Sequence, residues 1–416
     1  MSSENNFLKI YNGQAVTPSG ILTNATVLVR SGIIEAVAEG NLDATGATEL
    51  DAKGKYISPG LIDIQVNGYN AVSFCLEGAS DTSEDYKAVN LTVSDVKKVT
   101  EGLWKEGVTT YFPTLTTNSQ DVLKKNFGIL AKAMEDPSFL GSISGFHLEG
   151  PYISPVEGYR GAHPLEHVRN PVWNEFLELY RASGEKIILI TVAPEVEGAY
   201  EFIGKCRELG IVVSLGHHNG TSGQIKKAID NGAGLATHLG NGCAGMINRH
   251  LNPIWPQLAD ERLKISFIAD GFHLPPDMLR VFYKTKGVDN CVITSDITSY
   301  AGLPAGTYKI KDGKTVEKTE DGNLRFSEGG LYGSASPLRN GVAHILKVSG
   351  CGLVNAIRMT TLNPATVHNL NDRGVLEKGK RADLILFTLE NEKMVIQKTI
   401  VAGKEVFSNI ICQAER

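Results

Sequence analysis

Four side chains that can bind a metal ion or exchange a proton stand where short apolar runs of this chain end. They are Glu149, His217, His238 and Asp296, and they are far apart in the sequence. Two histidines and a glutamate form a common set of catalytic zinc ligands, which leaves one coordination position for water. The types of these residues therefore indicate a metal-dependent enzyme, with Asp296 as a second carboxylate in the site.

Taken singly, each of these residues also has a purely structural explanation. A buried histidine is usually a hydrogen-bonded core residue, and an aspartate after a strand is often a helix N-cap. All four, however, follow separate strand-like runs, and the carboxyl ends of parallel strands converge on one face of an α/β barrel. Their joint placement favours one shared functional site.

The middle of the chain alternates apolar runs with helical stretches, which predicts an α/β protein with a (β/α)8 TIM-like barrel. Runs that are apolar throughout are typical of parallel strands buried on both faces. Thr221 and Gln224 predict a capping box for a helix that ends at Asn231 and Gly232. The eight predicted barrel strands are residues 61–66, 109–113, 143–148, 187–192, 211–215, 234–237, 264–268 and 292–294.

Both ends of the chain are predicted to be β structure and to form one small β-sandwich domain together. We assign residues 1–57 and 377–416 to this domain and residues 58–376 to the catalytic barrel. The segment 304–333 is predicted to be a hairpin inserted after the eighth barrel strand. The predicted terminal strands are residues 7–11, 25–30, 33–38, 49–51, 383–387, 395–401 and 404–407.

The composition of the chain indicates which partners and which compartment to expect. The formal net charge is −5 and no basic block occurs, which argues against nucleic acid or an anionic membrane as partner. The N-terminus lacks the apolar segment of a signal peptide, and no run approaches a membrane span, so we expect a cytoplasmic enzyme. The cysteines show no CxxC spacing and are expected to be free thiols. They are Cys75, Cys206, Cys243, Cys291, Cys351 and Cys412.

Three positions in or near this set can be interpreted in two ways. His217 and His218 are adjacent, and successive residues leaving a strand point in opposite directions, so only one should bind the metal. We favour His217 because it stands closer to the strand end. His147 is either a partner of Glu149 or a packed core histidine. Cys243 lies near His238, although a small buried hydrophobe is the usual role of a free cysteine.

Motifs along nearly the whole chain resemble the amidohydrolase superfamily, and within it the family of N-acetylglucosamine-6-phosphate deacetylases. The pieces His-Leu-Glu-Gly-Pro and Ala-Asp-Gly-Phe-His are fairly specific to these deacetylases, whereas the C-terminal motifs are shared across the superfamily. The matching segments are residues 58–68, 107–115, 146–151, 160–163, 192–195, 214–217, 237–239, 269–273, 294–296, 363–365 and 379–384.

The resemblance implies a role for each matching residue. Glu149, His217 and His238 would hold one divalent metal ion, zinc or else iron or another ion, and Asp296 would be the general base and acid. Many superfamily members have His-x-His after the first strand for a second metal, where this chain has Gln65 and Asn67; these two are expected to line the pocket. The resemblance also implies a homodimer. The residues that would contact the substrate are His163, Asn241, Gly242, Arg249, His250 and His273.

The implied reaction is hydrolysis of the N-acetyl amide of N-acetylglucosamine-6-phosphate. The chain departs from the family at Gly242 and Cys243, where Ala-Met is usual, at His218, where Ser or Thr is usual, and in the spacing after Arg249. These departures lie around the sugar and phosphate pockets. An amidohydrolase of another N-acyl or cyclic amide therefore stays open as the alternative. A non-catalytic relative is disfavoured, because the chain keeps the metal set and Asp296.

Overall fold

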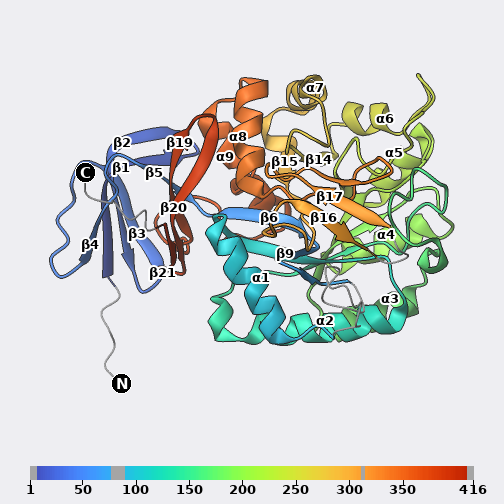
Figure 1. The fold of residues 1–416 in the computed structure, drawn as a ribbon, viewed down its shortest axis with the longest axis horizontal. Coiled ribbons are helices and arrows are strands. Elements are labelled where there is room, and N and C mark those ends of the chain that lie inside the picture. The colour runs from blue at the N-terminus through green and yellow to red at the C-terminus, as the bar shows by residue number, and fades with distance from the viewer. Residues whose placement is uncertain (1–6, 76–89, 311–313, 410–416) are drawn as a thin grey trace.

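The fold is built around a barrel of eight parallel strands (Figure 1). The computed structural model describes residues 7–75, 90–310 and 314–409. The predicted barrel is confirmed, and each predicted strand overlaps an observed one. In barrel order the strands are β6 (Leu61–Val66), β9 (Val108–Thr116), β10 (Phe146–Glu149), β11 (Ile187–Val192), β12 (Val212–Leu215), β13 (Ala233–Ala236), β14 (Lys264–Ile268) and β15 (Cys291–Thr294).

The barrel closes between β15 and β6, where a single parallel bridge, Val66 with Ile297, joins β6 to the described segment just after β15. The backbone N–H of Asn67 donates to the carbonyl of Ile297 at 2.8 Å. All other neighbouring barrel strands are joined by ladders of parallel pairing. This seam therefore lies at the carboxyl end of the eighth strand, beside Asp296.

Helices surround the barrel and pack against it with faces of buried side chains. In α2, the buried residues Val122, Asn126 and Leu130 recur at the spacing of one helix face. The predicted capping box at Thr221 is confirmed at the start of α5, and Gly232 ends that helix. The helices are α1 (Val93–Lys105), α2 (Gln120–Glu135), α3 (Trp173–Ala182), α4 (Ala199–Glu208), α5 (Ser222–Asn231), α6 (Ile254–Ala259), α7 (Pro276–Lys286), α8 (Leu338–Ser349), α9 (Gly352–Arg358) and α10 (Leu362–Val367).

Strands from both ends of the chain form a separate small β domain at one side of the barrel (Figure 1). All its strands are joined in one hydrogen-bonded sheet, and the sheet encloses a core of its own that includes Ile10, Val27, Ile57 and Leu384. The prediction of a β domain made from both termini is confirmed. Its strands are β1 (Phe7–Thr17), β2 (Gly20–Arg30), β3 (Ile33–Glu39), β4 (Thr48–Asp51), β5 (Tyr56–Pro59), β19 (Leu384–Glu390), β20 (Lys393–Val401) and β21 (Lys404–Ser408).

The small domain contacts the barrel through β20. The hydroxyl of Thr399 donates to the carbonyl of Trp104 in α1 at 2.7 Å, and Arg339 in α8 donates to the carbonyl of Met394 at 3.3 Å. The strand β5, which the sequence reading missed, runs across the predicted boundary at residues 57 and 58. The boundaries themselves stay a prediction.

The predicted insertion after the eighth barrel strand is a three-stranded antiparallel sheet rather than a two-stranded hairpin. It consists of β16 (Gly306–Lys309), β17 (Thr315–Lys318) and β18 (Leu324–Phe326). A further short pair, β7 (Gly68–Tyr69) and β8 (Val72–Ser73), follows β6. These small sheets lie in segments that directly follow the eighth and the first barrel strands.

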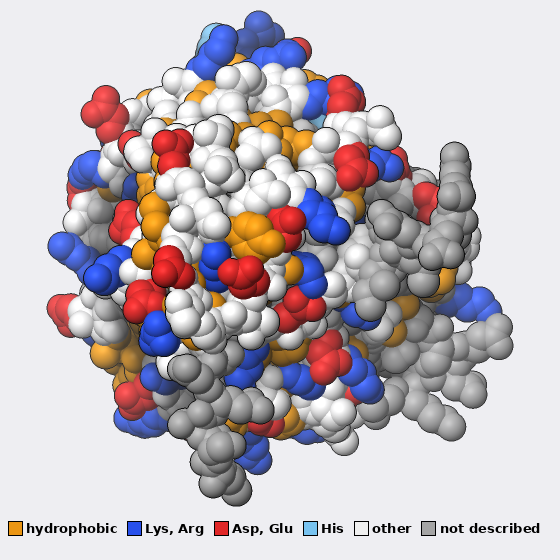
Figure 2. Space-filling model, turned by 90° about the vertical axis from the view of Figure 1, so that its left-hand side faces the viewer, with side chains coloured by type: hydrophobic (Ala, Val, Ile, Leu, Met, Phe, Trp, Pro, Cys, Tyr) orange, Lys and Arg blue, Asp and Glu red, His pale blue; other side chains and the backbone are white. Residues whose placement is uncertain are grey.

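The exposed surface carries charges of both signs. In Figure 2, acidic and basic side chains are interspersed over the face that the view presents, without a large field of one sign. Among the described helices, none has both the length and the apolar character that crossing a bilayer requires.

The cap of α5 gives a direct test of how local sequence stabilises the fold. Thr221→Ala removes the side-chain acceptor for the Gln224 N–H, so we expect the free energy of unfolding to fall by about 1 kcal/mol. Thr221→Ser keeps the hydroxyl and is the matched control. The measurement is urea denaturation followed by circular dichroism. An equal loss in the serine variant would contradict the assigned role of the cap.

Candidate active site

Glu149, His217 and His238 meet at the carboxyl ends of their strands. His217 Nε2 lies 3.2 Å from Glu149 Oε1 and 3.2 Å from His238 Nε2, and His238 Nε2 lies 3.0 Å from Glu149 Oε1. All three side chains are buried. Asp296 joins them through Gln65, whose Nε2 donates to Glu149 Oε1 at 2.9 Å and to Asp296 Oδ1 at 2.8 Å. The structure therefore brings together the four groups that the sequence singled out.

Three of these residues share one backbone feature. His217, His238 and Asp296 each stand two residues beyond the end of a strand, and each has a left-handed φ, of 51°, 31° and 52° respectively. Histidine and aspartate occur in this region more often than most residues, although it is still strained for a non-glycine residue. The left-handed turn interrupts the alternation of the strand, so the side chain can point toward the barrel axis.

The donor set fits one divalent ion. Two unprotonated imidazole nitrogens only 3.2 Å apart would repel each other in a buried site unless a cation lay between them. Donor atoms that lie 2.0–2.1 Å from a tetrahedral ion are separated by about 3.3 Å, close to the spacings seen here. Within the part of the chain that the structure describes, this is the one cluster of at least three such donors.

The ionised forms of Glu149 and His238 stabilise each other. Burial opposes ionisation of Glu149, but hydrogen bonds with His217 and His238 outweigh it and hold the pKa of this carboxyl well below its usual range. Burial likewise opposes protonation of His238, yet its hydrogen bond with Glu149 raises its pKa. Protons and a metal ion therefore compete for His238, and acid favours loss of the ion.

Asp296 is held in place by two amide side chains. Asn67 Nδ2 and Gln65 Nε2 both donate to its Oδ1, at 2.7 and 2.8 Å. Burial, followed by the negative charge of Glu149, raises the pKa of Asp296 to about 7. A carboxyl with a pKa near neutrality can both accept and release a proton at working pH, which suits a general base and acid.

His163 borders the cluster at His217. Its Nε2 lies 3.3 Å from His217 Nε2, and its Nδ1 is hydrogen-bonded to Thr117 at 2.8 Å. Burial lowers the pKa of His163 to about 3, so the ring is neutral. A Cβ at Gly242, which has a φ of 58°, would lie 3.0 Å from the ring of His217, so glycine allows this close approach. The segment 241–242, which the sequence predicts to bind substrate, thus packs directly on a candidate ligand.

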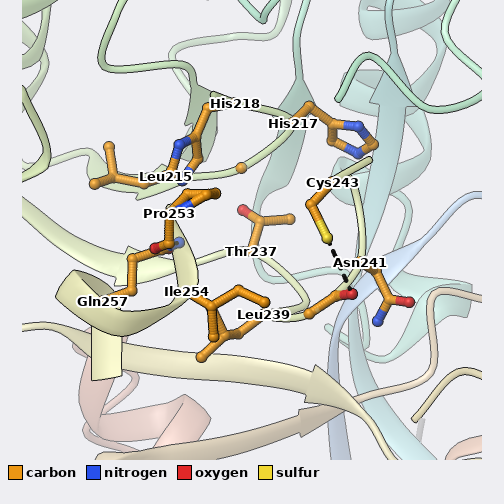
Figure 3. Close-up of a pocket in the computed structure, with 13 residues that line it drawn as sticks. Leu215, His217, His218, Thr237, Leu239, Asn241, Cys243, Pro253, Ile254 and Gln257 are labelled. Carbon is orange, nitrogen blue, oxygen red and sulfur yellow. Dashed lines mark hydrogen bonds between the residues drawn. The ribbon is translucent and has the colours of Figure 1, made fainter. Parts of the chain in front are cut away.

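A small cavity of about 10 Å³ lies beside the cluster, between the loop after β13 and the start of α6 (Figure 3). It has room for about one water molecule. His217, His218 and Cys243 all line it, and the Cys243 thiol donates to the Gly240 carbonyl at 3.5 Å. His218 Nδ1 accepts the backbone N–H of Gly220 at 3.2 Å and takes no part in the metal cluster.

Among the described contacts, the remaining predicted residues are not hydrogen-bonded to the cluster. His273 is hydrogen-bonded to Asp270 at 2.8 Å. Arg249 and His250 are exposed, and among the described contacts neither side chain is bonded to the cluster. His147 is buried and hydrogen-bonded to Thr191 at 2.8 Å, as expected of a packed interior histidine.

The cysteines that the structure describes are all free, as predicted. Cys412 lies outside the described residues. Thr117, the partner of His163, was missed because the second barrel strand was predicted to end at Pro113. In the structure β9 continues to Thr116, so its last residues reach the site.

The chain matches the model of the Amidohydrolase family over residues 56–406. It is 27% identical over 397 residues to an N-acetylglucosamine-6-phosphate deacetylase of Lysinibacillus sphaericus, covering 95% of this chain and 97% of the relative. It is 32% identical over 371 residues to the deacetylase of the same name from Bos taurus, covering 86% of this chain and 85% of the relative.

Among solved structures, the fold is similar to that of N-acetylglucosamine-6-phosphate deacetylase from Pasteurella multocida. The TM-score is 0.84 at 28% sequence identity, and the match covers 97% of this chain and 100% of the other. Enamidase, at 18% identity and a TM-score of 0.62, shares the fold alone. The similarity thus extends over both the barrel and the small β domain.

Adjacent histidines allow a matched test of the metal cluster. His217→Asn removes one of three ligands, and we expect its metal affinity to fall by more than about tenfold. His218→Asn changes the neighbouring buried histidine, which lies outside the cluster, and should keep wild-type metal content. The measurement is elemental analysis after dialysis against a weak chelator. Full occupancy in His217→Asn, or loss only in His218→Asn, would show that the cluster is assigned wrongly.

Proposed function

Because the chain belongs to the amidohydrolase family, we propose that it hydrolyses the N-acetyl amide of N-acetylglucosamine-6-phosphate to glucosamine-6-phosphate and acetate. The enzyme would thus be a hydrolase of a linear amide C–N bond. The observation that carries the proposal is the cluster of Glu149, His217 and His238 with Asp296 beside it, in a chain similar to such deacetylases over nearly its whole length.

We propose that Glu149, His217 and His238 hold one metal ion, zinc by preference, since two imidazoles and a carboxylate suit it. When bound there, the ion would supply a Lewis acid that polarises the amide carbonyl and makes water a better nucleophile. Gln65 and Asn67 are amides, which are poor ligands for a second ion. Their N–H groups instead donate to the two carboxylates of the site.

Asp296 would move the proton of the reaction. As a carboxylate it accepts a proton from the attacking water, and its Oδ1 is already oriented by Gln65 and Asn67. The protonated acid then gives this proton to the amine nitrogen as the C–N bond breaks, because an unprotonated amide anion is a poor leaving group. His163, being neutral, can donate an N–H to the acetamide oxygen as negative charge develops there.

The sugar phosphate would be held by residues around the cluster. The Asn241 side-chain N–H group is buried and has no hydrogen-bond partner among the described residues, and Gly242 follows it directly. We propose that these two residues and His273 bind the sugar, and that Arg249 and His250 bind the phosphate through charge-assisted hydrogen bonds.

We also propose that the enzyme works as a homodimer in the cytoplasm. The segment that carries Arg249 exposes three large apolar side chains, Met246 at 93%, Leu251 at 84% and Trp255 at 53%. An exposed apolar cluster of this kind is typical of a protein interface. The division into a barrel of residues 58–376 and a β domain of residues 1–57 and 377–416 belongs to the same proposal.

The proton transfer predicts a pH dependence. Below the pKa of Asp296 the carboxyl is protonated and cannot accept a proton, so kcat should fall with acid. Burial raises this pKa to about 7, and the charge of a bound cation lowers it again, so the acid limb should lie at or below about pH 7. Asp296→Asn should lose this limb and reduce kcat by about 10²–10⁴.

The control for this measurement is the metal content at each pH, because acid also protonates His238. The assignment of the base fails if Asp296→Asn keeps the wild-type kcat and the same pH profile while its metal content is unchanged.

The substrate is tested with a panel of N-acetyl sugars, each with and without a 6-phosphate, and of other N-acyl and cyclic amides. We expect the highest kcat/KM on N-acetylglucosamine-6-phosphate. Arg249→Ala should lower it by about 10–100-fold on this substrate and leave the unphosphorylated sugar unaffected, because only the phosphate bonds to Arg249. If the enzyme prefers another amide, the proposed sugar substrate is wrong and the alternative substrate class is supported.

A further inference from the structure

The seam between β15 and β6 is held by different contacts along its length. At its lower end, Ile62 and Ile293 donate their backbone N–H groups to consecutive carbonyls of one segment, those of Thr360 and Met359, at 2.8 and 2.9 Å. At its upper end the bridge between Val66 and Ile297 joins β6 to the segment just after β15. Between these points no backbone hydrogen bond links the described residues of β15 to those of β6.

The carboxylate of Asp63 fills this interval. Its Oδ1 accepts the hydroxyl of Thr294 at 2.8 Å and the backbone N–H of Ser295 at 3.1 Å. Its Oδ2 accepts the hydroxyl of Ser295 in a short hydrogen bond. The backbone N–H of Gln65, on the same strand as Asp63, completes the set at 3.4 Å. One side chain of β6 thus holds the end of β15 through three of its donors.

Burying the Asp63 carboxylate costs free energy, because the charged group loses its hydration. Asp63 is 0% exposed, and no lysine, arginine or histidine pairs with it among the described ion pairs. A buried carboxylate without a cation must recover its lost hydration from hydrogen bonds alone. A hydrophobic residue would avoid that cost, but it would leave the Ser295 N–H without a partner.

The donors that Asp63 accepts come from the two residues directly before Asp296. The Ser295 hydroxyl also accepts the backbone N–H of Ile297 at 3.2 Å, so it spans Asp296 from one side to the other. On the far side, the Ile297 carbonyl accepts the N–H of Asn67 at 2.8 Å. The strained left-handed backbone of Asp296 is therefore fixed to β6 both before and after the residue.

We infer that Asp63 is a positioning residue for the reaction: through Ser295 it holds the backbone turn that aims the Asp296 carboxylate at the metal cluster. The inference rests on the proposed function, in which Asp296 is the base. Gln65 in β6 and Asn67 just beyond it contact the side chain of the same base, whereas Asp63 contacts the residues before it.

The experiment is a double-mutant cycle of Asp63→Asn with Asp296→Asn, measured as kcat, KM, metal content and thermal unfolding. Because a small displacement of a catalytic group costs up to about 100-fold in rate, we expect Asp63→Asn to lower kcat by about 10–100-fold, with KM and metal content unchanged. In the Asp296→Asn background it should have no further effect on kcat, since there is no base left to position.

Ser295→Ala removes the hydroxyl that spans Asp296 and serves as the second variant if Asp63→Asn does not fold. It should reproduce the loss of kcat and its absence in the Asp296→Asn background. Asp383→Asn is the control for a buried carboxylate far from the site, bonded to Arg381. It should lower thermal stability and leave kcat as in the wild type.

The outcomes separate the two proposals. If Asp296→Asn alone keeps the wild-type kcat, the proposed base is wrong. If Asp296→Asn is slow but Asp63→Asn is as fast as wild type, or lowers kcat by the same factor in both backgrounds, the base stands and the positioning role of Asp63 is overturned.

Discussion

The crowding of Glu149, His217 and His238 is the constraint on which the rest of the structure depends. Three donor atoms from three different strands lie within 3.2 Å of one another in a buried site. Such a cluster is unfavourable without a cation and cannot form from neighbouring residues of one strand. It requires parallel strands whose carboxyl ends meet, and that is what the closed barrel provides.

The same requirement explains the details of the backbone around the site. A strand directs alternate side chains to opposite faces, so a residue just beyond its end needs a turn before it can face the axis. His217, His238 and Asp296 make this turn in the left-handed region. Glycines at the positions that contact the His217 ring, such as Gly242, leave room for that side chain. Strain in the backbone and small residues around the ligands are thus two consequences of one geometry.

Much of this arrangement could be predicted from the sequence, because the barrel strands are apolar throughout and the candidate ligands stand at their ends. The ends of the strands were harder to predict. Pro113 suggested an early end to β9, whereas the ladder continues to Thr116, so Thr117 was missed. The strand β5 was missed because it is short and ends in a proline. The contacts of Asp63 also could not be foreseen, since they depend on how the last strand meets the first.

The residues proposed to bind phosphate illustrate a different limit. Arg249 and His250 could be proposed from a motif, but their positions relative to the metal cluster depend on a loop that carries little regular structure. The exposed apolar residues of that loop belong to the proposed homodimer interface. The three candidate metal ligands, in contrast, all come from one chain, and they support the reaction class.

The most direct test of the account is an anomalous diffraction measurement on crystals of the purified protein, recorded on both sides of the absorption edge of its metal. We predict one anomalous peak in each chain, bonded to Glu149, His217 and His238, with Asp296 near it and no second peak at Gln65 and Asn67. A peak bonded elsewhere, or an active enzyme with no metal at these three residues, would contradict the account.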